Sequence, residues 1–258
     1  MTLFLLPLLL PVAASYFPRV ALDTDIGTDF DDAWAFTYLL SQSIPNSPSR
    51  KLDFQLIQCS TFNTTNRARI AAKMMFNLGR FDVPLAVGKY TGEDSMNQLP
   101  AAEGFQLSDF VAAGGKVYYG EDYLAGLMGA STPIDPLFVV EIAPATSLGD
   151  TVRANPSLAA NVIVTAMSGS VYHGYGNSSS PEAEYNVRVD VAASQAMYAA
   201  SWLSPLMMAP LDTSGLLRCI APEWANLIAA NNSAHPYAQE LLRNYKVWCV
   251  FKVHWAEE

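Results

Sequence analysis

Residues 20–33 of the chain have the sequence VALDTDIGTDFDDA. The first three residues, Val20 to Leu22, are apolar and predict a short buried strand. Five aspartates then fall within the ten positions from Asp23 to Asp32, with Gly27 among them. The segment 33–40 that follows has helical character. In an open α/β sheet, a loop that joins a strand to a helix in this way lies at the carboxyl edge of the sheet, where ligands bind.

The aspartates of this loop repel one another, so the cluster is costly unless a positive charge neutralises it. A hard divalent cation with oxygen ligands, Ca²⁺ or Mg²⁺, suits such groups. The simpler interpretation is a solvated acidic loop in which Asp31 or Asp32 caps the following helix. The strand before the loop, the glycine within it and the helix after it favour the metal site.

The rest of the chain alternates between apolar β-type runs and helical patterns. We expect strands at 20–22, 54–57, 83–87, 137–142 and 162–166, and helices at 33–40, 67–78, 191–202 and 222–230. Residues 89–129 show weak periodicity, which predicts loops and short helices. This alternation indicates an α/β fold, with a mainly parallel, Rossmann-like open sheet and helices on both faces. No long linker divides the chain, so residues 15–258 are expected to form one domain.

The composition is that of a globular protein with a large core, because 51% of the 258 residues are hydrophobic and 15% are charged. The net charge of −9 disfavours binding to the phosphate backbone of nucleic acids. None of the three cysteines is at CxxC spacing, which excludes a zinc ribbon or a thioredoxin motif. Three histidines leave little room for histidine-based metal or triad chemistry.

The amino terminus predicts a secretory signal peptide. Residues 1–14 carry no charged side chain, residues 3–10 are almost all apolar, and small residues at 13 and 14 suit cleavage after about Ala14. The protein is therefore expected to be secreted or vacuolar. The apolar run is shorter than the ~20 residues that span a bilayer, and no later segment is long enough, so no membrane anchor is expected.

Sequons at Asn63, Asn177 and Asn231 fit a secretory route and predict a glycoprotein. The three cysteines allow a Cys219–Cys249 bridge with Cys59 free and buried.

Other metal and phosphate motifs match the acidic loop poorly. An EF-hand needs glycine at loop position six, whereas a loop that begins at Asp23 has Gly27 at position five. Asp23-Thr24-Asp25 shares the Asp-x-Asp pattern of Mg²⁺-dependent phosphohydrolases with an aspartyl nucleophile. Those enzymes have Thr or Val at the position where this chain has Gly27, so this function is the weaker alternative. The chain has no P-loop and no GxSxG motif.

The acidic loop resembles the signature of the calcium-dependent, inosine-uridine-preferring nucleoside hydrolases, with a two-residue insertion at Asp29-Phe30. Four later blocks resemble elements of the same family, in the same order, so that the resemblance covers roughly residues 20–215. They are Thr61-Phe62-Asn63, Ala143-Pro144-Ala145-Thr146-Ser147, Ala166-Met167-Ser168-Gly169, and Gly176-Asn177 with Glu184-Tyr185-Asn186-Val187 and Asp190.

The resemblance implies hydrolysis of the N-glycosidic bond of a ribonucleoside to free base and ribose. It implies that Ca²⁺ is bound by Asp25, Asp32 and the backbone carbonyl of Thr146, and that Asp31 is the general base for the attacking water. The implied ribose pocket consists of Asn63, Met167, Asn177, Glu184 and Asn186. His173 is a candidate contact of the leaving group. The implied partner is a small ribonucleoside, and a homo-oligomer is a family expectation.

The family's last metal-ligating Asp, often preceded by a catalytic His, has no counterpart near the end of this sequence, where Trp255 follows His254. We therefore expect the C-terminal part of the family fold to be missing. Two hypotheses remain beside the phosphohydrolase: an active nucleoside hydrolase, or an impaired family member that binds Ca²⁺ or nucleosides weakly.

Overall fold

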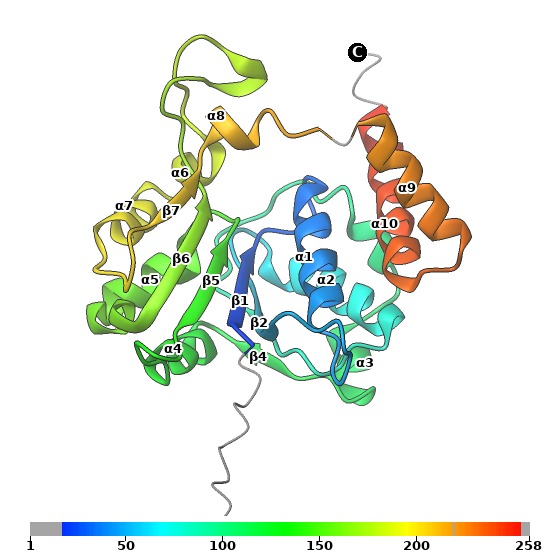
Figure 1. Ribbon diagram of the computed structural model, residues 1–258, viewed down its shortest axis with the longest axis horizontal. Coiled ribbons are helices and arrows are strands. Elements are labelled where there is room, and N and C mark those ends of the chain that lie inside the picture. Colours follow the sequence, from blue (N-terminus) through cyan, green and yellow to red (C-terminus); the bar gives the residue numbers. More distant parts are fainter. Residues whose placement is uncertain (1–16, 219, 254–258) are drawn as a thin grey trace, which may run out of the picture.

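The computed structural model describes residues 17–218 and 220–253. Its centre is a seven-stranded sheet in which all neighbouring strands are parallel, in the order β4-β3-β2-β1-β5-β6-β7 (Figure 1). The strands are β1 (Arg19–Thr24), β2 (Asp53–Cys59), β3 (Leu85–Val87), β4 (Val117–Tyr119), β5 (Leu137–Glu141), β6 (Val162–Met167) and β7 (Met207–Ala209). The expected leader, Cys219 and residues 254–258 lie outside the described residues.

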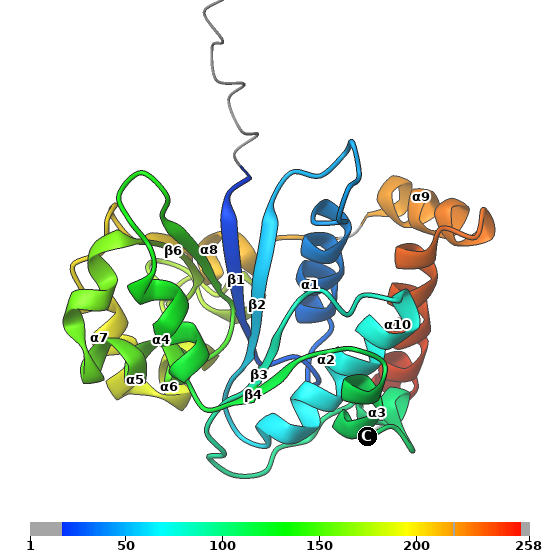
Figure 2. The same cartoon turned by 90° about the horizontal axis from the view of Figure 1, so that it is seen from below.

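Helices cover both faces of this sheet, as the sequence predicts (Figure 2). One layer contains α1 (Asp31–Gln42), α2 (Thr64–Leu78), α3 (Leu107–Ala112) and α10 (Pro236–Val253), with α9 (Ala221–Asn232) packed on α10. The other contains α4 (Asp122–Gly129), α5 (Thr146–Ala154) and α7 (Val191–Ala199). The remaining helices are α6 (Tyr185–Val189), α8 (Leu211–Ser214) and the short 3₁₀ turns η1 (Leu99–Ala102), η2 (Pro156–Asn161) and η3 (Tyr175–Asn177).

A hydrophobic core lies on each face of the sheet. Strand β1 contributes side chains to both cores because its side chains alternate between the two faces. Val20 and Leu22 belong to the core under α1 and α2, whereas Ala21 belongs to the core under α4 and α5. This double burial explains why three consecutive residues of the strand, Val20 to Leu22, are apolar. Cys59, at the end of β2, is buried and free.

The chain order places a topological switch point beside β1. Strands β2, β3 and β4 follow one another on one side of β1, and β5, β6 and β7 on the other. In such sheets a ligand crevice opens where the strand order reverses, at the carboxyl ends of the strands. The acidic loop leaves β1 at this point.

The fold class is confirmed, but the sequence prediction lacks several elements. β4 lies inside the segment expected to contain only loops and short helices, and β7, α5, α6, α8, α10, η2 and η3 were not predicted. Both strands have three residues, too few for a periodic signal. Helix α2 starts at Thr64, before the expected start, because the Asn63 side chain caps it. The helix ends at Leu78, and the next residue, Gly79, has the left-handed conformation (φ 65°). Among the described helices, none is long and apolar enough to cross a membrane.

Two helical glycines differ in what surrounds them, which gives a test of the packing. A Cβ on Gly149, in α5, would lie 2.6 Å from the Cα and carbonyl oxygen of Ala193, whereas one on Gly126, in α4, would meet nothing within 4 Å. Gly149→Ala should therefore lower the free energy of unfolding by about 1–3 kcal/mol. Gly126→Ala should raise it by about 0.5–1 kcal/mol. Urea denaturation measures both, and equal effects would contradict the close contact between α5 and α7.

Candidate active site

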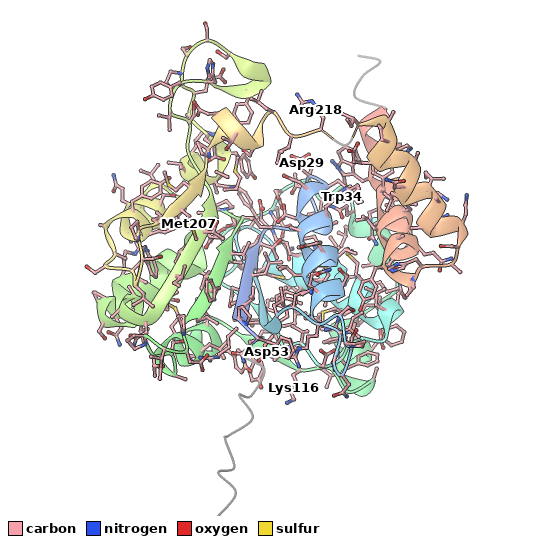
Figure 3. All side chains as sticks on the ribbon, in the orientation of Figure 1. Asp29, Trp34, Asp53, Lys116, Met207 and Arg218 are labelled. Carbon is pink, nitrogen blue, oxygen red and sulfur yellow. The ribbon has the colours of Figure 1, made fainter. Side chains whose placement is uncertain are left out.

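The acidic loop divides into buried and exposed aspartates. Asp23, Asp25 and Asp32 are buried, with 1%, 8% and 7% of their surface exposed, whereas Asp29 and Asp31 are exposed. Figure 3 places Asp29 at the carboxyl end of the sheet, opposite Asp53 at the amino end. Gly27 turns the chain with a φ of 130°, a conformation that side chains rarely adopt. The loop thus folds back so that Asp25 and Asp32 both face inward.

The sequence left open that Asp31 or Asp32 caps α1. The N-cap residue is Phe30, which makes no side-chain capping hydrogen bond, so neither aspartate is the N-cap. Asp32 instead accepts a hydrogen bond from the hydroxyl of Thr24, which itself accepts one from the Ile26 N–H at 3.1 Å. Asp31 stands in the first turn of α1, where the helix dipole favours a negative charge.

Burial and mutual repulsion shift the acidity of the inner carboxyls. Burial raises the pKa of Asp25 from 3.8 to about 7; the Arg67 charge opposes this shift, while Asp31 and Asp94 add to it. Burial, then the charges of Asp25 and Asp31, raise the pKa of Asp32 well above its ordinary value. Two carboxyls that destabilise each other's charge in this way would be stabilised by a cation.

The donor set fits a hard cation. Asp25 and Asp32 carry buried carboxylates, and Thr146, a buried residue, is the first residue of α5. Carboxylate and backbone carbonyl oxygens are ligands that Ca²⁺ takes. Within the described residues, no three His, Cys, Asp or Glu side chains are grouped closely enough to hold a metal ion. The resemblance thus leaves two carboxylates and one backbone carbonyl as the candidate ligands.

The structure gathers four further predicted residues where β5 and β6 end. Glu184 is buried and caps α6, and it accepts hydrogen bonds from the N–H groups of Gly169 (3.0 Å), Asn186 (2.7 Å) and Val187 (3.1 Å). The Asn186 amide donates to the carbonyls of Ile142 (3.1 Å) and Met167 (3.0 Å). The Thr146 hydroxyl donates a hydrogen bond at 3.0 Å to Asp190, the residue that follows α6. Strong local bonds thus hold Glu184 and Asn186 in place.

The other predicted residues lie apart from this group. Asn63 follows β2. Its side-chain oxygen accepts from the Asn66 N–H and so caps α2, and its side-chain NH₂ donates to the Glu93 carboxylate at 3.0 Å. Asn177 ends η3, and its side chain lies outside the described part. His173 is exposed in the segment between β6 and α6, with Nδ1 3.0 Å from the Ser178 carbonyl. A carbonyl only accepts hydrogen bonds, so Nδ1 carries a proton.

Several residues of this region were missed by sequence reasoning, above all Arg67, Asp94 and Asp212. Arg67 carried a signal: it lies on the same face of α2 as the buried residues Ile70 and Met74, three and seven positions later. A charged residue on a buried helical face needs a partner. Asp94 and Asp212 stand in irregular or short segments and carried no such signal.

Asp212 organises the segment that contains His173. It lies in α8, beside the loop that projects beyond β6 (Figure 1). Its carboxylate accepts hydrogen bonds from three consecutive backbone N–H groups: Val171 (2.8 Å), Tyr172 (2.7 Å) and His173 (3.0 Å). These bonds lower the pKa of Asp212, beginning with that from Val171. The loop is thus anchored through a charge-assisted backbone contact.

Asp212→Ala should release this loop. Hydrogen–deuterium exchange at the amides of residues 171–173 should become several-fold faster, because their acceptor is lost. Glu223→Ala, at an exposed acid in the first turn of α9, is the matched control and should leave these amides unchanged. Unchanged exchange in Asp212→Ala would show that the loop is held by other contacts.

Removal of a buried charge should stabilise the cation-free chain. The folded-state pKa of Asp25 lies above its ordinary value. The folded state therefore binds more protons than the unfolded state between about pH 4 and pH 7, and stability falls as the pH rises through that window. At about pH 8 in EDTA, Asp25→Asn should raise the free energy of unfolding by on the order of 2 kcal/mol.

Urea denaturation at a series of pH values measures this effect, with Asp53→Asn at the amino end of the sheet as the control. Asp25→Asn should flatten the decline of stability with pH and abolish stabilisation by added Ca²⁺. A decline as steep as that of the unmodified chain would mean that Asp25 is not the buried titrating group.

Comparison with solved structures places this fold among nucleoside hydrolases. An inosine-guanosine nucleoside hydrolase is similar with a TM-score of 0.72 and 18% identity, over 92% of this chain and 74% of that one. An inosine-uridine preferring nucleoside hydrolase from Bacillus anthracis has a TM-score of 0.65 and 14% identity, over 90% and 76%. A purine-preferring ribonucleoside hydrolase from Gardnerella vaginalis has a TM-score of 0.65 and 18% identity, over 92% and 74%. At these identities the likeness concerns the fold alone.

Sequence comparison gives different results for single proteins and for protein families. A search of curated proteins gives no match. Residues 20–254, however, match the family profile described as inosine-uridine preferring nucleoside hydrolase. The matched region contains the acidic loop after β1, Thr146 and the Glu184–Asn186 segment. Because this match spans nearly the whole sequence, the chain belongs to the inosine-uridine preferring nucleoside hydrolase family.

Proposed function

We propose that this protein hydrolyses the N-glycosidic bond of ribonucleosides, to give the free base and ribose. The observation that carries the proposal is the pair of buried carboxyls, Asp25 and Asp32, with Asp31 beside them at the switch point of the sheet. Family membership supports the reaction class. The similar structures are described as acting on inosine, guanosine, uridine or purine ribonucleosides, and we propose substrates of these kinds.

We propose Ca²⁺ as the cofactor, held by Asp25, Asp32 and the Thr146 carbonyl. When bound, the ion would lower the pKa of a water and orient it toward the sugar. The raised pKa values of the two carboxyls, each pushed upward by neighbouring charges, fit a site that awaits positive charge.

Asp31 is the proposed general base that takes the proton of the attacking water. It is exposed at the start of α1, next to Asp32, so it can meet solvent while the buried carboxyls serve the cation. If Asp31 is the base, Asp31→Asn should lower kcat while calcium affinity is retained.

The proposed ribose contacts are Asn63, Met167, Asn177, Glu184 and Asn186. Amide and carboxylate groups pair with sugar hydroxyls and discriminate against sugars that lack them. Glu184 and Asn186 suit this task because backbone bonds fix their orientation. The proposed leaving-group contact is His173: with Nδ1 protonated toward Ser178, its Nε2 is the remaining polar atom.

A second candidate is a family member that binds Ca²⁺ and nucleosides without efficient turnover. The absence of a third grouped carboxylate from the described residues favours it, because a cation with few protein ligands is weakly held. The engagement of the Asn63 amide by Glu93 favours it too.

Ribose release from inosine and uridine, in Ca²⁺ and in EDTA, tests the proposal. The unmodified chain should release ribose only with Ca²⁺, and Asp31→Asn should lower kcat by roughly 100-fold or more. Asp53→Asn, whose ion pair with Arg50 lies at the opposite end of the sheet, should keep full activity.

No ribose release, together with measurable Ca²⁺ binding, would replace this proposal with the second candidate. Phosphate release from a nucleotide would point instead to the Asp-x-Asp phosphohydrolase, the third hypothesis that the sequence raised.

A further inference from the structure

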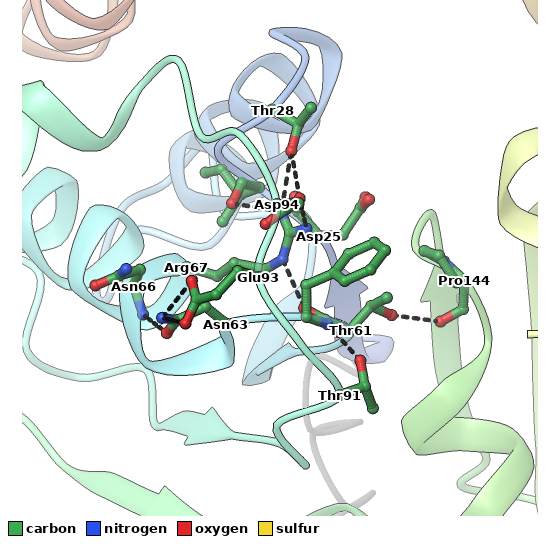
Figure 4. Close-up of polar contacts among 12 residues, drawn as sticks. Asp25, Thr28, Thr61, Asn63, Asn66, Arg67, Thr91, Glu93, Asp94 and Pro144 are labelled. Atoms are coloured by element: carbon green, nitrogen blue, oxygen red, sulfur yellow. Dashed lines mark hydrogen bonds and ion pairs between the residues drawn. The ribbon is translucent and has the colours of Figure 1, made fainter. Parts of the chain in front are cut away.

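The completely buried side chain of Arg67 connects three segments of the chain, one of which is the acidic loop (Figure 4). Nε donates to the Thr61 carbonyl at 2.9 Å, and Nη1 donates to the carbonyls of Asp25 and Ile26, the latter at 3.2 Å. Nη2 forms an ion pair with Asp94 at 2.6 Å. The guanidinium thus ties the β1–α1 loop to the end of β2 and to the segment after β3.

The turn that Arg67 holds is strained. Thr61 and Phe62 have φ values of 72° and 55°, in the left-handed region that residues other than glycine rarely occupy. Such backbone persists only when surrounding contacts enforce it. Here Arg67 donates a hydrogen bond to the Thr61 carbonyl. The Phe62 N–H donates to the Thr91 hydroxyl at 2.6 Å, and the Thr91 N–H donates to the Phe62 carbonyl at 3.1 Å. The segment Thr91–Asp94 therefore serves the same turn as Arg67.

We propose that Arg67 is a positioning residue of the calcium site. We further propose that Asp94 is the counter-charge that lets a guanidinium support the Asp25 loop without opposing a cation. This inference rests on the proposed function, because it assigns the two residues to the ion that the hydrolysis would use.

The charge of Arg67 and the charge of a bound cation would compete at this place. Arg67 Nη1 donates to the backbone carbonyls of Asp25 and Ile26, so its positive charge lies beside Asp25. An uncompensated guanidinium at that place would repel a divalent cation on the same carboxylates. Asp94 has 11% of its side chain exposed and also accepts from the Thr28 hydroxyl at 3.0 Å. It is therefore held where it cancels the Arg67 charge.

A second buried arginine provides a matched control. Arg80 pairs with Asp82 at 2.7 Å and donates to the backbone carbonyl of Leu40, as Arg67 does to that of Asp25. It follows the carboxyl end of α2, about 20 Å from Arg67 by the rise of the helix. Asp82→Asn thus removes the acid of a similar pair at a place remote from the carboxylates.

The test is the affinity of each variant for Ca²⁺, by calorimetry on EDTA-treated and dialysed protein without nucleoside. Asp94→Asn should raise the Kd for Ca²⁺ by about tenfold, equivalent to about 1.4 kcal/mol. Asp82→Asn should leave the Kd within about twofold, even where both variants lower the melting temperature similarly. Asp94→Glu keeps the charge and should stay within about threefold of the unmodified chain.

The double variant Arg67→Met/Asp94→Asn separates charge from position. It removes both charges, so its Kd should return toward that of the unmodified chain. Its kcat at saturating Ca²⁺ should remain low, because the loop has lost its anchor. If Asp94→Asn does not fold, the comparison of Asp94→Glu with the double variant carries the test: the charge argument requires both to bind Ca²⁺ nearly as well as the unmodified chain.

Equal Kd changes in Asp94→Asn and Asp82→Asn would overturn the inference, as would a double variant that binds Ca²⁺ no better than Asp94→Asn. An unmodified chain that binds no Ca²⁺ would overturn it as well. A chain that binds Ca²⁺ with the expected pattern but releases no ribose would contradict only the proposed hydrolysis. A chain that releases ribose while Asp94→Asn binds Ca²⁺ normally would contradict only the role of Asp94.

Discussion

The burial of like charges at the end of β1 is the constraint on which the rest of the site depends. Asp25 and Asp32 lie within the protein, where a carboxylate loses most of its hydration. A hydrogen bond from the Thr24 hydroxyl to Asp32 and the nearby charge of Arg67 offset part of that cost. The raised pKa values of both carboxyls show that the offset is incomplete. Further positive charge near these two carboxyls would therefore stabilise the loop.

The parallel sheet brings distant segments to this loop. Because β1 lies between β2 and β5, the turns after these strands flank the aspartates on either side. On the β5 side, Asn186 donates to carbonyls at the ends of both β5 and β6 and so fixes the distance between them. On the β2 side, Arg67 and Thr91 hold a left-handed turn. The β5 side of the loop is thus fixed by amide contacts, and the β2 side by an arginine that forms an ion pair.

Local features were predictable from the sequence, and long-range partnerships were not. The acidic loop, the central strands and the end of α2 before Gly79 follow from short stretches whose pattern is self-contained. Arg67 and Asp94 are 27 positions apart, and Asp212 lies about 40 positions from the amides it holds, so no local pattern joins them. The resemblance named Glu184 and Asn186 as ribose contacts, and the structure adds their local bonds to the backbone. Strands β4 and β7 were missed because three residues show no period.

The central claim is that Asp25, Asp32 and the Thr146 carbonyl bind one Ca²⁺ ion. Anomalous diffraction from crystals soaked in Ca²⁺ tests it most directly. The account predicts a peak with oxygen atoms of all three residues at about 2.3–2.6 Å. A peak elsewhere, for example in the groove of about 510 Å³ lined by Glu121, Asp122 and Asp150, or no peak at all in crystals that diffract well, would contradict it.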